Sequence, residues 1–172
     1  NVEVTFSGVT TSTSIMGVTP DYQRVRNYDL TEGEFISADN MLARASVAVV
    51  GPDLADKLFD RRDGLVGEII RVEGQPFRVI GVLQSKGGST FGSQDNVLLV
   101  PMTTATARLV RRNNDRVDTI FVEASTADTV QQASDEIAEI LRQRHRTQLG
   151  EDDFTVFSQQ DFVATAKTIT NV

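Results

Sequence analysis

The sequence predicts an α+β fold, in which short strands and helices alternate along the chain. Three patterns carry this prediction: a strand–turn–strand hairpin near the middle, a continuous apolar run typical of a strand buried on both faces, and one long amphipathic helix in the last third. The 172 residues are enough to bury a core in one domain or in two small subdomains.

The first elements are two strands and a short helix. Residues 2–6, VEVTF, alternate apolar and polar side chains as a half-buried strand does. The Ser/Thr-rich residues 8–14 predict a turn, and a second strand follows around residues 14–18. A short helix is expected next: Thr19 can cap it, and Pro20, the following residue, suits the first helical position.

The next stretch holds the buried strand. Phe35 is expected to anchor the loop of residues 31–37 to the core. Residues 45–50 are the continuous apolar run, and residues 52–59 predict a short helix. Its apolar side consists of Leu54, Leu58 and Phe59.

The hairpin is the most regular pattern. Residues 68–72 and 77–83 are rich in β-branched side chains, and residues 73–75 supply the turn. Pro76 opens the second strand, where a missing N–H does least harm. The apolar pattern then stops in the glycine-rich residues 84–95, so this loop is either a mobile connection or a segment held by a partner.

Strands and helices are expected to alternate again after the glycine-rich loop. Residues 97–100 predict a strand closed by Pro101, and a helix runs from Thr103 or Thr104 to Arg112. A strand is then expected over residues 117–124. Thr126 caps the long helix, whose apolar positions are Val130, Ala133, Ile137, Ile140 and Leu141. After it, residues 154–157 predict a strand, and Ser158 with Asp161 resembles the capping box of a last helix over residues 159–169.

Composition excludes several classes of function. The net charge of −7 argues against a general nucleic-acid binder, because duplex binding depends on Lys and Arg that neutralise phosphates. The absence of cysteine excludes thiol catalysis and cysteine-bound metals, and it suits an oxidising compartment. No apolar run is long enough to cross a bilayer.

The residues with reactive side chains form no catalytic pattern. His145 is the one histidine and stands among arginines at the end of the long helix, where the helix dipole favours cations. The arginines of residues 108–116 fit the same interpretation, with a basic patch for a partner as the alternative. Asp152 and Asp153 are adjacent and make a poor acid/base pair, and Lys86 precedes its glycines, unlike a P-loop lysine. The sequence therefore predicts a protein that is not an enzyme, with no catalytic residue, metal or cofactor.

Four separated strings carry a resemblance to a known family. They are GVTPDYQRVRNYDLTEGEFIS, VAVVGPDLADKLF, VGEIIRVEGQPFRVIGVL and DNVLLVPMTTATARL. In this order and spacing they resemble the MacB-like extracytoplasmic (periplasmic) core domain of bacterial ABC transporter permeases, in the FtsX-type superfamily. The resemblance covers nearly the whole chain.

The resemblance implies two subdomains. One is an α/β porter-like unit with β-α-β character, expected over residues 1–32 and 117–172. The other is a β-rich, sabre-like middle insertion, expected over residues 33–116. Family members usually carry a further strand and helix before the position of Val2, so the first subdomain is expected to be incomplete in this chain.

The resemblance also implies a function. Such a domain lies on the extracytoplasmic side of the bacterial inner membrane, in the periplasm of a Gram-negative cell, between the first two transmembrane helices. It couples ATP hydrolysis by a cytoplasmic ATP-binding subunit or domain to export, and it contacts a second permease protomer and a periplasmic adaptor. The alternative is a sensor domain that binds a peptide or lipid. A ligand pocket needs convergent aromatic and polar groups. The chain has no Trp, two Tyr and nine Phe, and most of the Phe lie at predicted strand core positions, so the composition favours the mechanical role.

The glycine-rich loop is the candidate partner-binding site. Phe91 is expected to be its apolar anchor, since aromatic residues dominate interface hot spots, with Gln94 and Asp95 as hydrogen-bonding rim residues. The residues assigned to the site are Gly87, Gly88, Ser89, Phe91, Gly92, Gln94 and Asp95.

Overall fold

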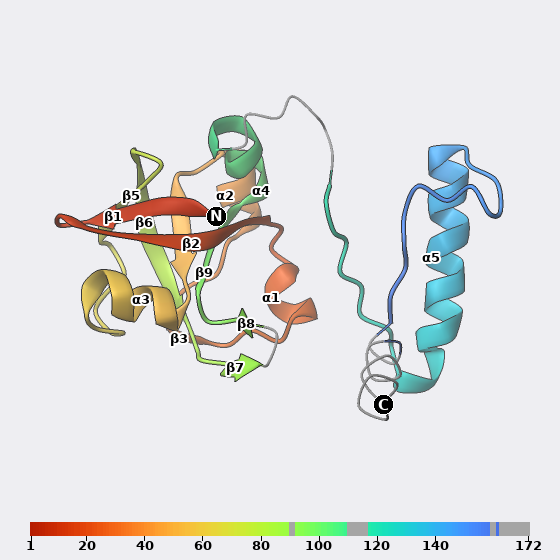
Figure 1. Cartoon of the computed structure of the whole chain (residues 1–172), viewed down its shortest axis with the longest axis horizontal. Coiled ribbons are helices and arrows are strands. Elements are labelled where there is room, and N and C mark those ends of the chain that lie inside the picture. Colours follow the sequence, from red (N-terminus) through yellow and green to blue (C-terminus); the bar gives the residue numbers. More distant parts are fainter. Residues whose placement is uncertain (90–91, 110–116, 159–160, 162–172) are drawn as a thin grey trace, which may run out of the picture. The chain divides into compact units, whose positions relative to one another are not determined.

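The structure is a computed structural model that describes residues 1–89, 92–109, 117–158 and 161. The chain divides into two compact units, Asn1–Phe121 and Val122–Val172 (Figure 1). No helix within the described ranges is both long and apolar enough to span a bilayer.

The first unit is built around a seven-stranded sheet that closes on itself. Its strands follow the spatial order β3 (Leu30–Gly33), β6 (Gln75–Leu83), β4 (Val47–Val50), β9 (Val97–Pro101), β2 (Val9–Val18), β1 (Val2–Phe6) and β5 (Ile69–Val72). Strand β6 also pairs with β5, so six strands form a closed ring and only β3 lies outside it. Closure gives every strand of the ring a partner on both sides, which satisfies its backbone hydrogen-bonding groups.

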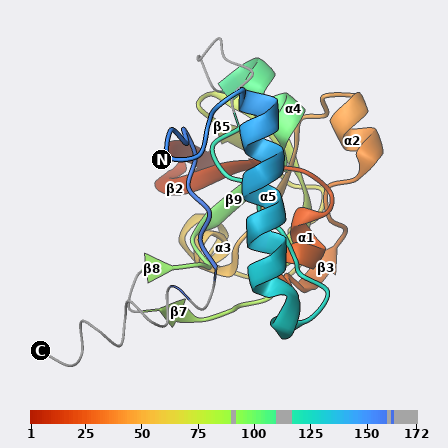
Figure 2. The same cartoon turned by 90° about the vertical axis from the view of Figure 1, so that its right-hand side faces the viewer.

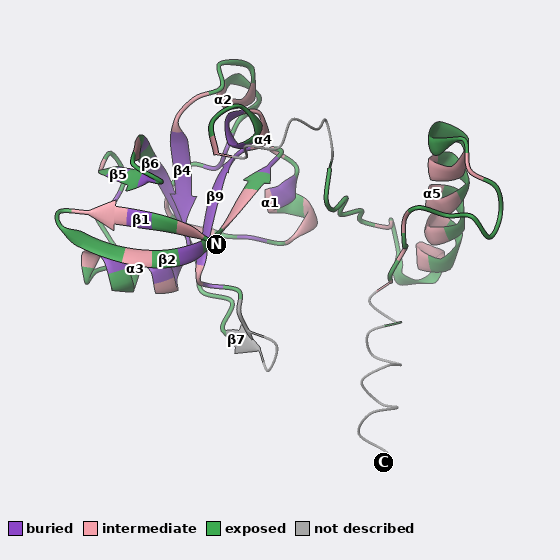
Figure 3. Cartoon of the chain, turned by 45° about the horizontal axis from the view of Figure 1, so that its top comes forward, coloured by how far each residue is buried: buried purple, intermediate pink, exposed green. Residues whose placement is uncertain are grey.

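Two apolar clusters pack on the two faces of the sheet. All six ring strands contribute to the inner cluster, together with Leu54 and Leu58 of helix α3 (Pro52–Phe59). The outer cluster gathers Phe35 and the tyrosines around helix α1 (Tyr22–Val25). Strands β4 and β9 contribute alternate residues to both clusters, and Figure 3 shows both as buried along their length. The prediction of a strand buried on both faces is therefore confirmed.

Several local predictions in this unit are confirmed, and others are wrong. Helix α1 begins at Tyr22 after an N-cap at Asp21, so Thr19 and Pro20 do not start it, and the predicted loop of residues 31–37 contains part of strand β3. The hairpin β5–β6 turns at Glu73–Gly74, and α3 has the predicted bounds. Residues 9–14, however, form no turn, because they lie in β2, which begins at Val9. The turn lies at Ser7 and Gly8, whose φ angles of 47° and 86° suit a two-residue hairpin. The threonines that follow are β-branched and pair well in a strand.

Short helices complete the first unit. Helix α2 (Ala38–Leu42) begins with a capping box between Ser37 and Asn40. Helix α4 (Met102–Thr104) continues into a π-helical turn, Ala105–Leu109, in place of the predicted helix from Thr103 or Thr104. The remainder of that helix, to Arg112, lies outside the described residues.

Within the described residues, the second unit contains one long helix. A 3₁₀ turn (Ala127–Thr129) leads into α5 (Val130–His145), which Figure 2 shows as a single unbroken helix. The strands predicted over residues 117–124 and 154–157 are absent, since the structure describes both stretches as non-strand. An extended segment becomes a strand only with a partner for its backbone groups. The Ser158–Asp161 capping box is present, while the helix expected after it lies outside the described residues.

The predicted subdomain boundary at residues 32 and 33 does not divide the sheet. Strand β2, assigned to the porter-like subdomain, pairs in parallel with β9, assigned to the insertion. Strand β1 likewise pairs with β5. Residues 1–18 therefore belong to the same closed sheet as residues 47–101, because long-range pairing joins them. The assignment of residues 117–172 to a porter-like subdomain stays a prediction.

Candidate partner-binding surface

The glycine-rich loop forms a small second hairpin. Strands β7 (Gly88–Ser89) and β8 (Gly92–Ser93) pair antiparallel, with Gly88 opposite Ser93. Figures 1 and 2 show this hairpin projecting from the seven-stranded sheet. Gly87 leads into it with a φ of +79°, a conformation that glycine adopts without strain. Phe91, the predicted anchor, lies outside the described residues, and its role stays a prediction.

Asp95 braces the base of the hairpin. Its side chain is only 4% exposed. Its carboxylate accepts hydrogen bonds from the Ser85 hydroxyl at 2.5 Å, from the Lys86 N–H at 2.9 Å and from the Gly87 N–H at 3.2 Å. The rim role predicted for Asp95 is therefore wrong, because a buried acceptor that is already engaged offers little to a partner. Gln94, next to it, is exposed as a rim residue should be.

The main chain of Asp95 ties the hairpin to helix α3. The Asp95 carbonyl accepts the N–H of Asp53, in the first turn of that helix, at 3.1 Å. Gly51 packs so closely that a Cβ there would lie 2.2 Å from the same carbonyl oxygen. A side chain at residue 51 would therefore push the hairpin base away from the closed ring of six strands, which we call the barrel.

The electrostatics of Asp95 follow from these contacts. Burial alone raises the pKa of its carboxyl, but the hydrogen bonds from Ser85, Lys86 and Gly87 stabilise the charged form more strongly. The pKa of Asp95 is lowered overall, so the brace is anionic at neutral pH. The prediction from sequence assigned the glycines of this loop to the site and gave Ser85 and Lys86 no role in it.

Lys86 joins the hairpin base to the aromatic residues near α1. Its Nζ lies 4.2 Å from the ring centroid of Tyr28 and donates a hydrogen bond to the Arg26 carbonyl. Burial and the nearby Arg26 lower the pKa of Lys86. Burial, followed by the nearby Tyr22, raises the pKa of Tyr28. The loop is thus anchored on two sides at its base, by Asp95 and by Lys86.

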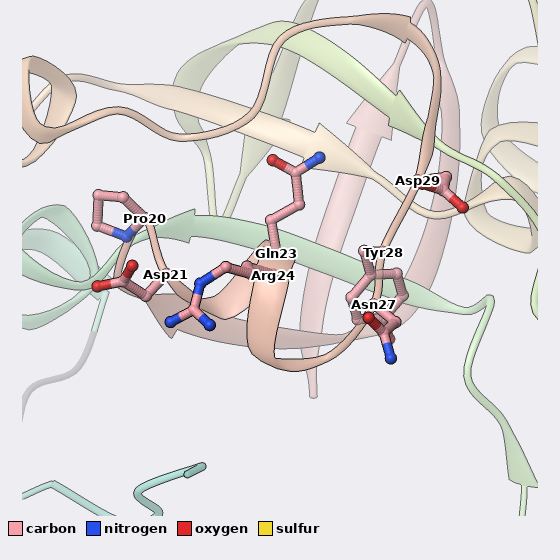
Figure 4. Close-up of a pocket in the computed structure, with 7 residues that line it drawn as sticks. All are labelled: Pro20, Asp21, Gln23, Arg24, Asn27, Tyr28 and Asp29. Carbon is pink, nitrogen blue, oxygen red and sulfur yellow. The ribbon is translucent and has the colours of Figure 1, made fainter. Parts of the chain in front are cut away.

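An open hollow lies beside α1, with a cavity volume of about 550 Å³ (Figure 4). Its lining is mostly polar or charged: Pro20, Asp21, Gln23, Arg24, Asn27, Tyr28 and Asp29. Small-molecule sites are mostly apolar with a few convergent polar groups. The hollow does not match that description, so it gives the sensor alternative no support.

The charged and titratable side chains at the end of α5 are held by hydrogen bonds to two aspartates. Arg142 binds the Asp152 carboxylate through two hydrogen bonds of 2.7 Å, and His145 Nδ1 lies 2.7 Å from an Asp153 oxygen. The bond to Asp152 raises the pKa of Arg142 and lowers that of Asp152. In the part of the chain that the structure covers, no group of three or more His, Asp or Glu side chains could hold a metal ion.

Comparison with known families gives a match over most of the chain. The model of the MacB-like periplasmic core domain matches residues 1–140. A protein from Bdellovibrio bacteriovorus, named macrolide export ATP-binding/permease protein MacB, is 35% identical over 161 residues, which are 92% of this chain and 24% of that protein. A protein of the same name from Rhodospirillum rubrum is 32% identical over 163 residues, 94% of this chain and 24% of that protein. The chain therefore spans about a quarter of the length of these relatives.

Two solved structures share the fold. The periplasmic region of MacB from Actinobacillus actinomycetemcomitans superposes with a TM-score of 0.73 at 19% identity, covering 99% of this chain and 72% of that chain. The extracellular domain of the ABC-type transporter YknZ from Gram-positive bacteria superposes with a TM-score of 0.66 at 21% identity, covering 86% and 72%. At these identities the likeness shows the fold alone.

Proposed function

The chain belongs to the family of MacB-like periplasmic core domains, and from this we propose that it forms the extracytoplasmic part of an ABC transporter permease. In this role it passes movements driven by cytoplasmic ATP hydrolysis to the far side of the membrane, and so couples hydrolysis to export. The observation that carries the proposal is the family match over residues 1–140, together with relatives whose name joins ATP binding to a permease.

The closed barrel supports a mechanical role. A ring in which each strand is paired on both sides resists local opening, so it can move as one body. The second unit, Val122–Val172 with the amphipathic helix α5, falls within residues 117–172, the C-terminal range that we assign to a porter-like subdomain. Such a pair of units suits transmission of a displacement better than capture of a small ligand.

The test of coupling is a flexible Gly-Ser insertion after Ile169 in the intact transporter. We expect ATP hydrolysis to continue while export falls, because a soft joint no longer transmits displacement. The same insertion after Gly8, in the exposed turn of the β1–β2 hairpin, is the matched control and should leave export unchanged. Full export with the Ile169 insertion would contradict the coupling role.

We propose further that this domain neither binds nor hydrolyses ATP. The sequence contains no P-loop motif. The N–H groups of Lys86 and Gly87, which a phosphate-binding loop would offer to a phosphate, donate instead to the Asp95 carboxylate. Isothermal titration of the purified chain with Mg-ATP, and a phosphate-release assay, should both give no signal. Hydrolysis that persists after removal of contaminating ATPases would overturn this proposal.

Peptides or lipid vesicles that raise the melting temperature of the purified chain would favour the sensor alternative.

We also propose that the β7–β8 hairpin is a contact for a protein partner, either the adaptor or the second protomer. The projection of the hairpin and its braced base support this, because an interface benefits from a presented and ordered segment. In the intact transporter, Phe91→Ala and Gln94→Ala should weaken capture of that partner while the domain stays folded. Val9→Ala, at the exposed residue that follows the turn of the β1–β2 hairpin, is the control. Normal capture by both loop variants would make the hairpin a connector only.

A further inference from the structure

A line of ring and cation contacts runs through the first unit from Phe121 to Lys86. The Phe121 ring meets Tyr22 edge-on, with centroids 5.6 Å apart. Tyr22 stacks on Tyr28 at 5.9 Å, and the Lys86 ammonium lies 4.2 Å from the Tyr28 centroid. Tyr22 and Tyr28 are buried, whereas Phe121 is 37% exposed and Lys86 is exposed, so the middle of this line is withdrawn from water and its two ends are open to it.

Arg26 joins the two ends of this line by a shorter route. Its guanidinium carbon lies 4.7 Å from the Phe121 centroid, and its carbonyl accepts the hydrogen bond from Lys86. The Arg26 Nε is buried, and no hydrogen bond to it is found within the described residues. The ring of Phe121 therefore provides favourable surroundings for a charge that is partly withdrawn from water.

The ends of the line have distinct places in the fold. Phe121 is the last residue of the first unit, directly before the chain enters the second. Lys86 stands at the base of the β7–β8 hairpin, where its N–H donates to Asp95. The line thus joins the point where the chain enters the second unit to the hairpin that projects from the sheet.

We propose a coupling between the position of Phe121, where the chain passes into the second unit, and the order of the hairpin base. The coupling runs through Tyr22, Tyr28, Arg26 and Lys86. When Phe121 is seated, Arg26 is held at the end of α1, and its carbonyl fixes Lys86. When Phe121 leaves, Arg26 turns toward water and the end of α1 shifts, so Lys86 loses its acceptor. This inference goes beyond the transport function and does not depend on it, because every contact lies within the first unit.

Hydrogen exchange in the full chain tests the coupling from one end. Phe121→Ala should speed exchange of the Lys86 and Gly87 amides by roughly 2-fold to 10-fold, the range expected for the loss of one aromatic contact. Ile120→Ala is the matched control, because Ile120 is the neighbouring residue and is 66% exposed. Exchange at Lys86 and Gly87 that is unchanged in Phe121→Ala, or equally faster in Ile120→Ala, overturns the proposal.

The reverse experiment uses the other end, because coupling between two sites is reciprocal. Lys86→Met keeps the apolar stem but removes the ammonium and its hydrogen bond. We expect it to shift the ring-proton resonances of Phe121, although two rings separate these side chains. Gln94→Ala, an exposed change in the same loop, should not shift them. Phe121 resonances that stay in place in Lys86→Met would overturn the coupling even if Phe121→Ala failed to fold.

Discussion

The two units of this chain bury their apolar side chains very differently. In the first unit the strands of the ring share a continuous core that runs from Val4 to Ala105. In the second unit α5 is amphipathic, yet none of its residues is fully buried. Leu149 and Phe157, also in the second unit, are 83% and 70% exposed.

The difference shows that an apolar pattern creates a core only when a second surface faces it. The ring supplies that surface from within, because each strand faces the others across the closed interior. Among the described residues of the second unit, every residue of α5 stays at least partly exposed, and most helical stability in proteins comes from packing of the amphipathic side. The stability of this chain should therefore reside mainly in the barrel.

The comparison is tested most strongly by the same truncation in both units. Phe77 is 1% exposed in the inner cluster, so Phe77→Ala should lower the free energy of unfolding by about 3 to 5 kcal/mol. Phe157→Ala, in the second unit, should change it by less than about 0.5 kcal/mol. Urea unfolding followed by circular dichroism measures both. Equal losses would show that the second unit carries as much of the core as the first.

A smaller loss is expected at the hairpin base. Asp95→Ala leaves the N–H groups of Lys86 and Gly87 and the Ser85 hydroxyl without their acceptor, and should cost about 2 to 3 kcal/mol. Gln94→Ala, next to it and exposed, should be close to neutral. If both variants unfold at the same urea concentration as the wild type, the brace contributes nothing to the barrel.

The same carboxylate gives the barrel a dependence on acid. The pKa of Asp95 is lower in the folded chain than its ordinary value of 3.8. Its stabilising effect is therefore fully present above that value and is lost as the pH falls through the folded pKa. Between neutral pH and pH 3 we expect the melting temperature of Asp95→Asn to fall less than that of the wild type. Identical pH profiles would mean that Asp95 has the same pKa folded and unfolded.

The smallest effect is expected on α5. Ile140 is 55% exposed, and alanine has the higher helix propensity, so Ile140→Ala should change the free energy of unfolding by less than about 0.5 kcal/mol. Val79→Ala, a truncation of a fully buried residue in the barrel, is the contrast and should cost several times more. A clear loss in Ile140→Ala would indicate that a partner or another segment covers this face.

Local patterns in the sequence were sufficient for many elements of the barrel. The hairpin of residues 68–83, the helix Pro52–Phe59 and the strand buried on both faces are all present, because each depends on neighbours in the chain. The strands expected over residues 117–124 and 154–157 had equally good patterns. They are absent, since a pattern supplies side chains but cannot supply the partner strand.

The sequence by itself determined most elements of the barrel and, through its motifs, the family. Only the tertiary structure decided that β6 pairs with both β4 and β5 and so closes the ring. It also decided that Asp95 is a buried brace instead of a rim residue, and that Phe121 reaches Tyr22 across a hundred residues of chain. These features depend on contacts between residues far apart in sequence, whereas periodicity and capping report only on residues that are close together.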